Sequence, residues 1–159
     1  LQNNKHFYDT NGLLVFDRIN RMNKMSAEYD LAGKVIGLAM SVHRTLGPGF
    51  VESVYEKALS LELTRAGISH KCQYGLTVNY KGESVGEFIT DIVVKDELIV
   101  ELKAVQNLVP IHEVQLVNYL TASGLDEGVL LNFGTESLQF KKKFRKPPNP
   151  PPLKRQPIL

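Results

Sequence analysis

Two acidic residues and one lysine are spaced so that a β-hairpin would bring them together. Asp91 lies in one run of strand-forming residues, and Glu101 and Lys103 lie in the next. Because side chains alternate along a strand, Glu101 and Lys103 must share a face. If residues 95–97 form a three-residue loop, Asp91 falls opposite Glu101 on that face. A two-residue loop would separate the two acids, so their convergence depends on the register.

Charges on a strand are usually explained by a solvent-exposed face, but here both faces of the hairpin are predicted to be buried. The apolar residues are Ile89, Val93, Ile99 and Val105 on the face of the acids, and Phe88, Ile92, Val94, Leu98, Val100, Leu102 and Ala104 on the other. A buried carboxylate without a partner costs several kcal/mol, so the charges need compensation. A divalent cation that prefers oxygen ligands, such as magnesium, would supply it. The alternative is a structural ion network of Asp91, Glu101 and Lys103 without metal.

The elements around this hairpin follow from hydrophobic periods and turn residues. Helices are predicted over residues 31–46, 50–66 and from 110 to about 124, and strands over 69–73, 76–80, 84–94, 98–105 and 128–133. The buried stripe of the second helix is predicted to contain Val51, Val54, Tyr55, Ala58, Leu59 and Leu63. The order helix, helix, strands, helix, strand predicts an α/β protein with a mixed central sheet flanked by helices.

The length of 159 residues and the 43% apolar content fit one domain with tails. We expect the domain over residues 28–140, with a poorly patterned N-terminal extension over 1–27. Residues 141–159 are predicted to form a disordered basic, Pro-rich tail. The single cysteine, Cys72, excludes an internal disulfide and a Cys-rich metal cage, and we expect it to be buried.

The net charge of +2 conceals an asymmetry along the chain. Residues 141–159 hold seven Lys and Arg and no acid, whereas the other 140 residues hold 12 basic and 17 acidic side chains. A body of that sign is no general polyanion binder, so contact with nucleic acid would need a local patch, the tail or a bound cation. No apolar run is long enough to cross a bilayer and the first residues do not have the order of a secretory signal, so we expect a cytoplasmic protein without membrane partners.

Four motifs occur in one order along the chain. Residues 49–55 (GFVESVY) have the form GxxExxY, Asp91 precedes Glu101-Leu102-Lys103, residues 115–119 (QLVNY) have the form QxxxY, and residues 128–134 read GVLLNFG. This set resembles the GxxExxY branch of the PD-(D/E)XK nuclease superfamily, with the QxxxY motif of its RecB-like members. The resemblance covers about residues 32–140, and Thr90 stands where the superfamily name has proline. It implies a restriction-endonuclease-like αβββαβ core with an extra leading helix.

The resemblance also implies a metal-dependent nuclease. Asp91 and Glu101 would hold Mg²⁺, with Mn²⁺ also open, and Lys103 would orient or help to deprotonate the attacking water or stabilise charge on the phosphate. Because most of the superfamily acts on DNA, we expect nucleic acid as substrate, with DNA favoured over RNA. The formation of a homodimer is left as an open alternative. The alternative is a non-catalytic nucleic-acid-binding or assembly module that keeps the fold, which predicts an incomplete site.

Five helical side chains are further candidates for the site. Glu52 lies in the first turn of its helix, where it could be a third metal ligand or only a helix-start acid. Gln115, a candidate catalytic residue, lies one helical turn from Tyr119, and His112 lies on the same side of the helix. Tyr119 and His112 could contact substrate or belong to the edge of the core. Tyr55 shares a face with Glu52 and could contact substrate or be a buried tyrosine.

Overall fold

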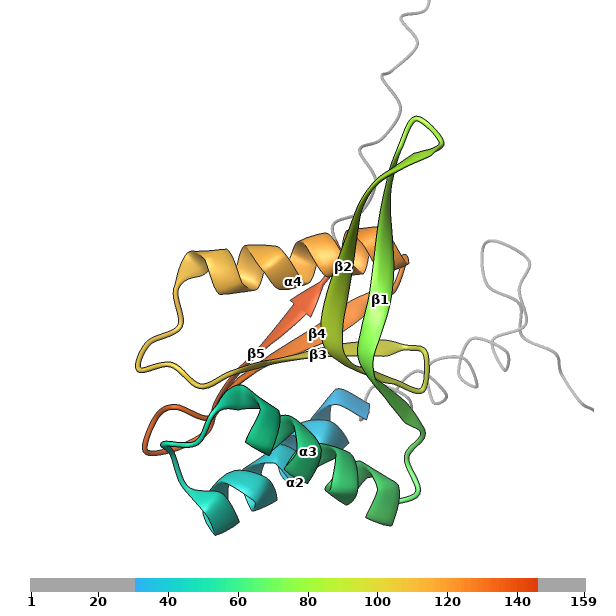
Figure 1. Ribbon diagram of the computed structural model, residues 1–159. Coiled ribbons are helices and arrows are strands. Elements are labelled where there is room, and N and C mark those ends of the chain that lie inside the picture. The colour runs from blue at the N-terminus through green and yellow to red at the C-terminus, as the bar shows by residue number, and fades with distance from the viewer. Residues whose placement is uncertain (1–30, 146–159) are drawn as a thin grey trace, which may run out of the picture.

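One mixed β-sheet with helices on both faces forms the protein, for which a computed structural model describes residues 31–145. In chain order the elements are α2 (Leu31–Leu46), α3 (Glu52–Arg65), β1 (His70–Tyr80), β2 (Glu83–Val94), β3 (Leu98–Lys103), α4 (Pro110–Ser123), β4 (Glu127–Asn132) and β5 (Gln139–Phe144). Figure 1 shows α2 and α3 on one face of the sheet and α4 on the other. The predicted α/β class, with a mixed sheet flanked by helices, is confirmed.

The strands lie in the order β1-β2-β3-β4-β5. All neighbours are antiparallel except β3 and β4, which are parallel. Parallel neighbours need a crossover connection, and α4 provides it. At the far end of the β1–β2 hairpin, Lys81 and Gly82 form a two-residue turn with φ angles of 51° and 86°. Positive φ at both central residues matches the right-handed twist of the paired strands.

The loop between β2 and β3 has three residues, which is one of the two alternatives that the sequence left open. Val94 pairs with Leu98, which leaves residues 95–97 to make the turn. Lys95 and Asp96 take left-handed φ angles of 53° and 55°, and Glu97 donates a backbone hydrogen bond of 3.0 Å to Val94. This loop length fixes the register that places Asp91 across from Glu101.

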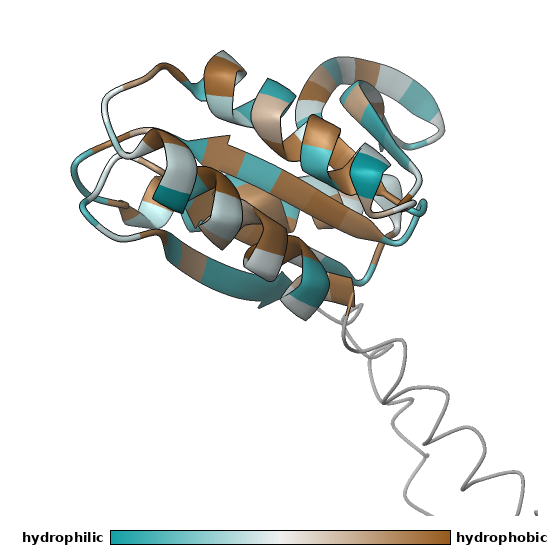
Figure 2. Ribbon diagram, turned by 90° about the horizontal axis from the view of Figure 1, so that it is seen from below, coloured by the Kyte–Doolittle hydropathy of each residue, from teal (hydrophilic) through white to brown (hydrophobic). Residues whose placement is uncertain are grey.

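Two hydrophobic cores lie on opposite faces of the sheet. The larger core packs α2 and α3 against β2, β3 and β4, with Tyr55, Leu59, Leu102 and Phe133 among its buried residues. The smaller core packs Leu116, Tyr119 and Leu120 of α4 against Leu76, Val93, Ile99 and Leu130. Figure 2 shows the hydrophobic residues concentrated on the strands between the helices. The central strand β3 is therefore buried on both faces, as its apolar sequence predicted.

Several predicted buried positions are wrong. Val51 is 66% exposed, because α3 begins one residue later and Val51 occupies the N-cap position. Phe88 and Ile89 are 46% and 60% exposed, because they lie near the limit of the part of the β1–β2 hairpin that α4 covers. Cys72 is also exposed, since it lies on the edge strand β1.

Strand β5 corrects the predicted boundary between domain and tail, because residues 141–144 belong to the sheet. Leu130 pairs with Lys141 and Glu127 pairs with Phe144. Both Lys141 and Lys143 form ion pairs with Glu113 of α4. The run of three lysines thus belongs to a charged edge strand, and such charges commonly protect a sheet edge from pairing with another chain.

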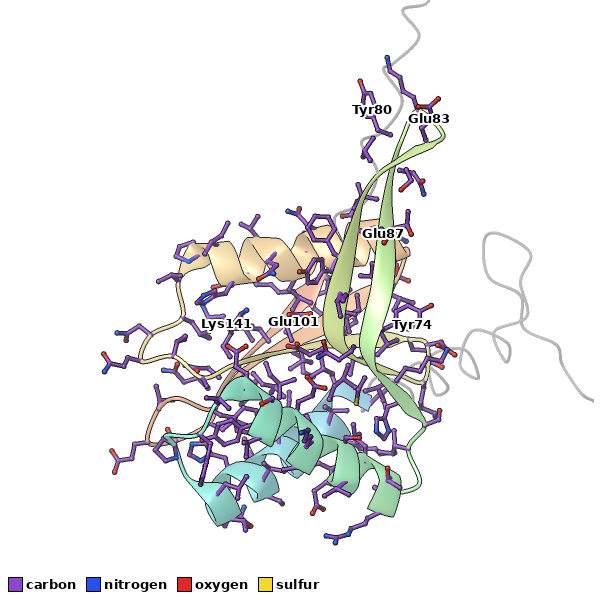
Figure 3. The ribbon with its side chains drawn as sticks, in the orientation of Figure 1. Tyr74, Tyr80, Glu83, Glu87, Glu101 and Lys141 are labelled. Carbon is purple, nitrogen blue, oxygen red and sulfur yellow. The ribbon has the colours of Figure 1, made fainter. Side chains whose placement is uncertain are left out.

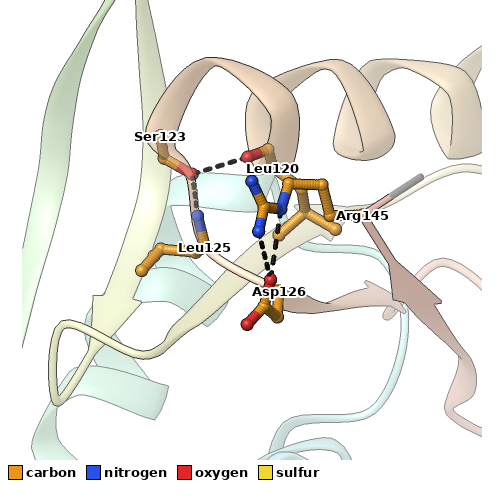
Figure 4. A network of polar contacts seen from close by, with 5 residues as sticks. All are labelled: Leu120, Ser123, Leu125, Asp126 and Arg145. Carbon is orange, nitrogen blue, oxygen red and sulfur yellow. Dashed lines mark hydrogen bonds and ion pairs between the residues drawn. The ribbon is translucent and has the colours of Figure 1, made fainter. Parts of the chain in front are cut away.

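The end of β5 is fastened to the start of β4 (Figure 4). The guanidinium group of Arg145 donates two hydrogen bonds, of 2.7 and 3.1 Å, to Oδ1 of Asp126. The backbone N–H of Arg145 also donates to the carbonyl of Asp126 at 2.9 Å. The predicted extension over residues 1–27, and the part of the predicted tail from residue 146 on, lie outside the described residues.

Among the helices of residues 31–145, none combines the length and the apolar composition that a bilayer crossing requires.

Candidate functional site

The strands β2 and β3 separate where Asp91 and Glu101 face each other. Their paired residues end at Ile92 and Val100. Beyond that point the carboxylates take the place of backbone acceptors. Asp91 donates its N–H to Oε1 of Glu101 at 3.3 Å, and Leu102 donates its N–H to Oδ2 of Asp91 at 2.7 Å. The predicted hairpin therefore brings the two acids together, each with one oxygen held by the opposite strand.

Thr90 fixes the same oxygen of Glu101 from the side. Its hydroxyl donates a 2.5 Å hydrogen bond to Oε1, and Thr90 itself is fully buried. Glu101 is only 4% exposed. Sequence reasoning treated Thr90 only as a substitute for proline and missed this contact. The signal available was a hydroxyl residue next to a predicted buried acid.

The environment of the two carboxylates favours their neutral forms. Burial, followed by the charge of Asp91, raises the pKa of Glu101 to about 7. Burial also raises the pKa of Asp91, and the charge of Glu52 adds to the effect. The hydrogen bonds from Thr90 and Leu102 and the charge of Lys103 act in the opposite direction but do not cancel the rise. The raised pKa values show that the positive charge and hydrogen bonds around the two buried carboxylates do not fully compensate their negative charges.

Lys103 ends β3 two residues after Glu101, on the same face and half-buried. Its charge lowers the pKa of both acids, but within residues 31–145 it forms no salt bridge. The backbone at this end of β3 is firmly held. Phe133 donates to the carbonyl of Lys103 at 2.7 Å, and the buried side chain of Asn132 bonds both the N–H and the carbonyl of Val105 at 3.0 and 2.9 Å.

Glu52 approaches the pair from the first turn of α3. It is exposed, and its negative charge contributes to the raised pKa of Asp91. Among residues 31–145, however, no three Asp, Glu, His or Cys side chains are gathered closely enough to hold a metal ion. The structure therefore places Glu52 near Asp91 without bringing it into a shared set of metal ligands.

Sequence reasoning missed a further acid on α3, one turn after Glu52. Burial raises the pKa of Glu56, and the charge of Asp91 also contributes. Its Oε2 accepts a 2.6 Å hydrogen bond from the amide of Gln73 on β1. Gln73 lies between Cys72 and Tyr74, which pair with Ile92 and Thr90, and has a left-handed φ of 51°. The i, i+4 spacing from Glu52 was the available signal.

Tyr55 is placed in the core, and this does not support the predicted contact with substrate. The side chain is fully buried and its ring stacks on Phe133 with centroids 4.5 Å apart. Its hydroxyl donates to the carbonyl of Gly47 at 2.6 Å and accepts from the N–H of Phe50 at 3.2 Å. Both hydrogen bonds hold the loop that leads into α3, so Tyr55 positions the segment before Glu52.

Of the three predicted site residues on α4, two are hydrogen-bonded to each other and the third caps the start of the helix. Gln115 donates a 2.7 Å hydrogen bond to the hydroxyl of Tyr119. Burial raises the pKa of Tyr119, and the charges of Glu101 and Asp91 contribute, so this pair lies beside the acids. His112 instead accepts a 3.2 Å hydrogen bond from the N–H of Val109 at the start of the helix. This cap explains His112 without a role in the site.

The comparison with protein families matches this arrangement. A family model described as the PD-(D/E)XK nuclease superfamily covers residues 29–146. The chain belongs to the PD-(D/E)XK nuclease superfamily. The restriction-endonuclease-like form of the sheet and its flanking helices, predicted from the sequence, agrees with this membership.

Two solved structures are similar to this superfamily member. The crystal structure of SSO0001 has a TM-score of 0.48 and 16% sequence identity, over 79% of this chain and 61% of the other. An alkaline exonuclease (LHK-Exo) from Laribacter hongkongensis has a TM-score of 0.44 and 10% identity, over 59% of this chain and 56% of the other. The chain thus spans less than two thirds of either protein. No curated protein matches it.

The superfamily generally uses divalent metals, and the paired acids provide suitable donors for one. One oxygen of each acid is anchored by protein donors, Oδ2 of Asp91 by Leu102 and Oε1 of Glu101 by Thr90 and Asp91. Two carboxylate oxygens of a partly neutralised pair fit a hard cation that keeps several waters. The donor set of Asp91 and Glu101 therefore fits a divalent metal.

Proposed function

We propose that the chain is a metal-dependent nuclease of the GxxExxY branch, which hydrolyses phosphodiester bonds in nucleic acid and favours DNA. The observation that carries the proposal is the pair Asp91 and Glu101, each anchored through one oxygen at the split between β2 and β3. Lys103 follows on the same face of β3. The preference for DNA rests on the resemblance to the superfamily alone.

Asp91 and Glu101 would hold Mg²⁺ or Mn²⁺, which supplies charge to polarise a phosphate and lowers the pKa of a bound water. Their shared burial keeps competing water away from the second oxygens and strengthens their attraction for a cation. Glu52, exposed at the start of α3, would bind the cation through an intervening water. The raised pKa of Asp91, to which the charge of Glu52 contributes, supports the proximity that such a role needs.

The protein's own groups would position the water and the phosphate. Lys103 lies half-buried next to the acids, where its ammonium group can orient or help to deprotonate a nucleophilic water or donate to a phosphate oxygen. Gln115 holds the hydroxyl of Tyr119 and keeps its carbonyl oxygen for a water or a substrate group. Tyr119 would line the substrate side, whereas His112 caps the start of α4.

The test is cleavage of labelled single- and double-stranded DNA and RNA with Mg²⁺ or Mn²⁺. Asp91→Asn, Glu101→Gln and Lys103→Met keep the size of each side chain and remove its charge. The matched controls are Glu97→Gln and Lys95→Met, which make the same changes at exposed positions of the loop between the two strands. We expect each site variant to lose at least a hundredfold in rate and each control to keep the rate of the wild type. Equal activity in all preparations would indicate a contaminant and contradict the proposal.

A non-catalytic nucleic-acid-binding module is the second candidate, favoured by the absence of a third acid from the paired site within residues 31–145. Binding of the same labelled strands without metal, together with no cleavage by the wild type in either metal, would support it.

Thermal unfolding distinguishes a metal site from a structural ion network that holds no metal. If Asp91 and Glu101 bind a cation, Mg²⁺ or Mn²⁺ raises the Tm of the wild type and not that of Asp91→Asn.

A further inference from the structure

The β1–β2 hairpin extends past the helix layer and carries aromatic side chains into solvent. Its inner half is covered by α4, which packs on Leu76 and Val93. Its outer half reaches Tyr80 and Glu83 at the tip, beyond α4 (Figures 1 and 3). Phe88 lies where the covered half ends and is 46% exposed. A large apolar side chain is thus presented to solvent only three residues before Asp91.

The ring of Phe88 is held in place on two sides. It packs against Tyr119 with centroids 5.8 Å apart and a tilt of 48°. It also leans along the strand over Gly86, because a Cβ atom placed on Gly86 would lie 3.6 Å from Cε2 of the ring. Phe88 is therefore an oriented aromatic surface, half of it open to solvent.

Tyr119 connects this ring to the paired acids. The hydroxyl of Tyr119 is bound by Gln115, and Tyr119 packs in the smaller core with Val93 and Ile99, each two residues along its strand from one of the paired acids. Phe88 touches the same tyrosine from the hairpin side. The aromatic surface and the carboxylates are thus two neighbours of one side chain, so a strand whose phosphate reaches the acids passes close to the ring.

The charge of the domain leaves a need for non-ionic contacts. Residues 31–145 contain 12 basic and 13 acidic side chains, and Lys141 and Lys143 are already paired with Glu113. Apart from Lys103, which lies beside the acids, the domain therefore offers little surplus positive charge to attract phosphates. Stacking of bases on aromatic side chains is the other general source of affinity for unpaired nucleic acid, and it does not require positive charge.

We propose that Phe88 is a substrate-binding residue on which an unpaired nucleobase next to the cleaved phosphate stacks. The proposal rests on the nuclease function proposed above and adds to it the class of substrate, a strand with an unstacked base at the site. The ring, packed against Tyr119, presents its open side to the base. Because every base has an aromatic face, this contact selects single-stranded or frayed substrate without selecting a sequence.

The chain contains no tryptophan, so Phe88→Trp introduces a single fluorescent reporter at this position. The probes are single-stranded oligothymidylate and an abasic oligonucleotide of equal length, both without divalent metal so that no cleavage occurs. We expect oligothymidylate to quench the introduced indole and the abasic strand to leave its fluorescence unchanged. The control is Phe144→Trp at the far end of β5, where the phenylalanine is 52% exposed, and we expect no quenching there. Equal quenching by both strands, or at both positions, would overturn the proposal.

Affinity provides the second measurement, in the same metal-free buffer. Phe88→Leu keeps an apolar contact with Tyr119 but removes the aromatic face, and we expect it to weaken oligothymidylate binding about tenfold or more. Phe88→Tyr should retain the affinity of the wild type, and the abasic strand should bind all three proteins alike. An unchanged affinity of Phe88→Leu, or no binding of oligothymidylate by the wild type, would overturn the proposal. If oligothymidylate stacks on position 88 but no strand is cleaved, the stacking proposal stands and the nuclease proposal is rejected. If the protein cleaves nucleic acid and Phe88→Leu leaves the KM unchanged, the nuclease proposal stands and the stacking proposal is rejected.

Discussion

The backbone N–H of Leu102 donates to Oδ2 of Asp91 at 2.7 Å, so a side chain of β2 replaces a backbone acceptor of the sheet. The N–H of Asp91 makes the reciprocal contact with Oε1 of Glu101 at 3.3 Å. Each acid is therefore fixed by the strand that carries the other. The two carboxylates cannot move apart without breaking these contacts, which explains why their charges stay close although burial makes this unfavourable.

The stability of the fold should depend on pH through Glu101. Its pKa is raised from 4.5 to about 7, so the folded form binds the proton more tightly than the unfolded form. The free energy of unfolding should then fall as the pH rises from about 4.5 through about 7, by on the order of 3 kcal/mol. Glu101→Gln cannot ionise and should show a smaller fall. Urea unfolding with a metal chelator at pH 5 and pH 8 measures the difference.

Glu97→Gln is the control for this prediction, since Glu97 is exposed on the loop beside β3. It should follow the pH dependence of the wild type. The interpretation of Glu101 as a strained buried acid would be contradicted if Glu101→Gln and the wild type lost the same free energy between the two pH values.

Thr90→Val should reveal how much the hydroxyl stabilises the charged form of Glu101. Valine keeps the shape of the fully buried side chain but cannot donate the 2.5 Å hydrogen bond. We expect a loss of roughly 1.5–3 kcal/mol at pH 8, where Glu101 is charged, and a smaller loss at pH 5. Unfolding of both proteins at the two pH values measures this, and Thr90→Ser, which keeps the donor, should restore most of the loss. Equal losses at both pH values would indicate a packing effect.

From the sequence, the register of the central hairpin depended on the length of one loop, and the structure has the three-residue alternative. Alternation along β3 placed Glu101 and Lys103 on one face, and a three-residue loop placed Asp91 opposite. Likewise, the spacing of Gln115 and Tyr119 on a helix was enough to place them side by side. These relations need only the geometry of one element or of two elements joined by a short turn.

The errors concern contacts between elements that are distant in sequence. Residues 141–144 have the composition of a tail, and their strand is stabilised by Glu113 on α4, which no local pattern indicates. Spacing placed Tyr55 on the face of Glu52 but could not say that this face turns toward Phe133. The contact of Glu56 with Gln73 depends on a left-handed residue within a strand, which propensity does not predict.

Gly134→Ala should unfold or strongly destabilise the protein. A Cβ atom there would lie 2.4 Å from the backbone N and O of Val105, in the segment directly after β3. Backbone cannot give way as a side chain can, so we expect a loss of several kcal/mol. Gly75→Ala is the control, because a Cβ atom on Gly75 meets nothing within 4 Å and that strand residue has no positive φ. Thermal unfolding should show a large fall in Tm for the first and little change for the second; similar falls would contradict the close contact.

Tyr55→Phe separates a positioning role from a contact with substrate. The phenyl ring can still stack on Phe133, but the hydrogen bonds to Gly47 and Phe50 are lost. Because these two groups are partly buried, we expect the free energy of unfolding to fall by about 1–3 kcal/mol. The affinity for oligothymidylate without metal should stay within about twofold of the wild type, since a fully buried side chain has no surface to offer a ligand. Chemical unfolding and fluorescence anisotropy provide the two values. A severalfold loss of affinity with unchanged stability would instead return Tyr55 to the substrate side of the site.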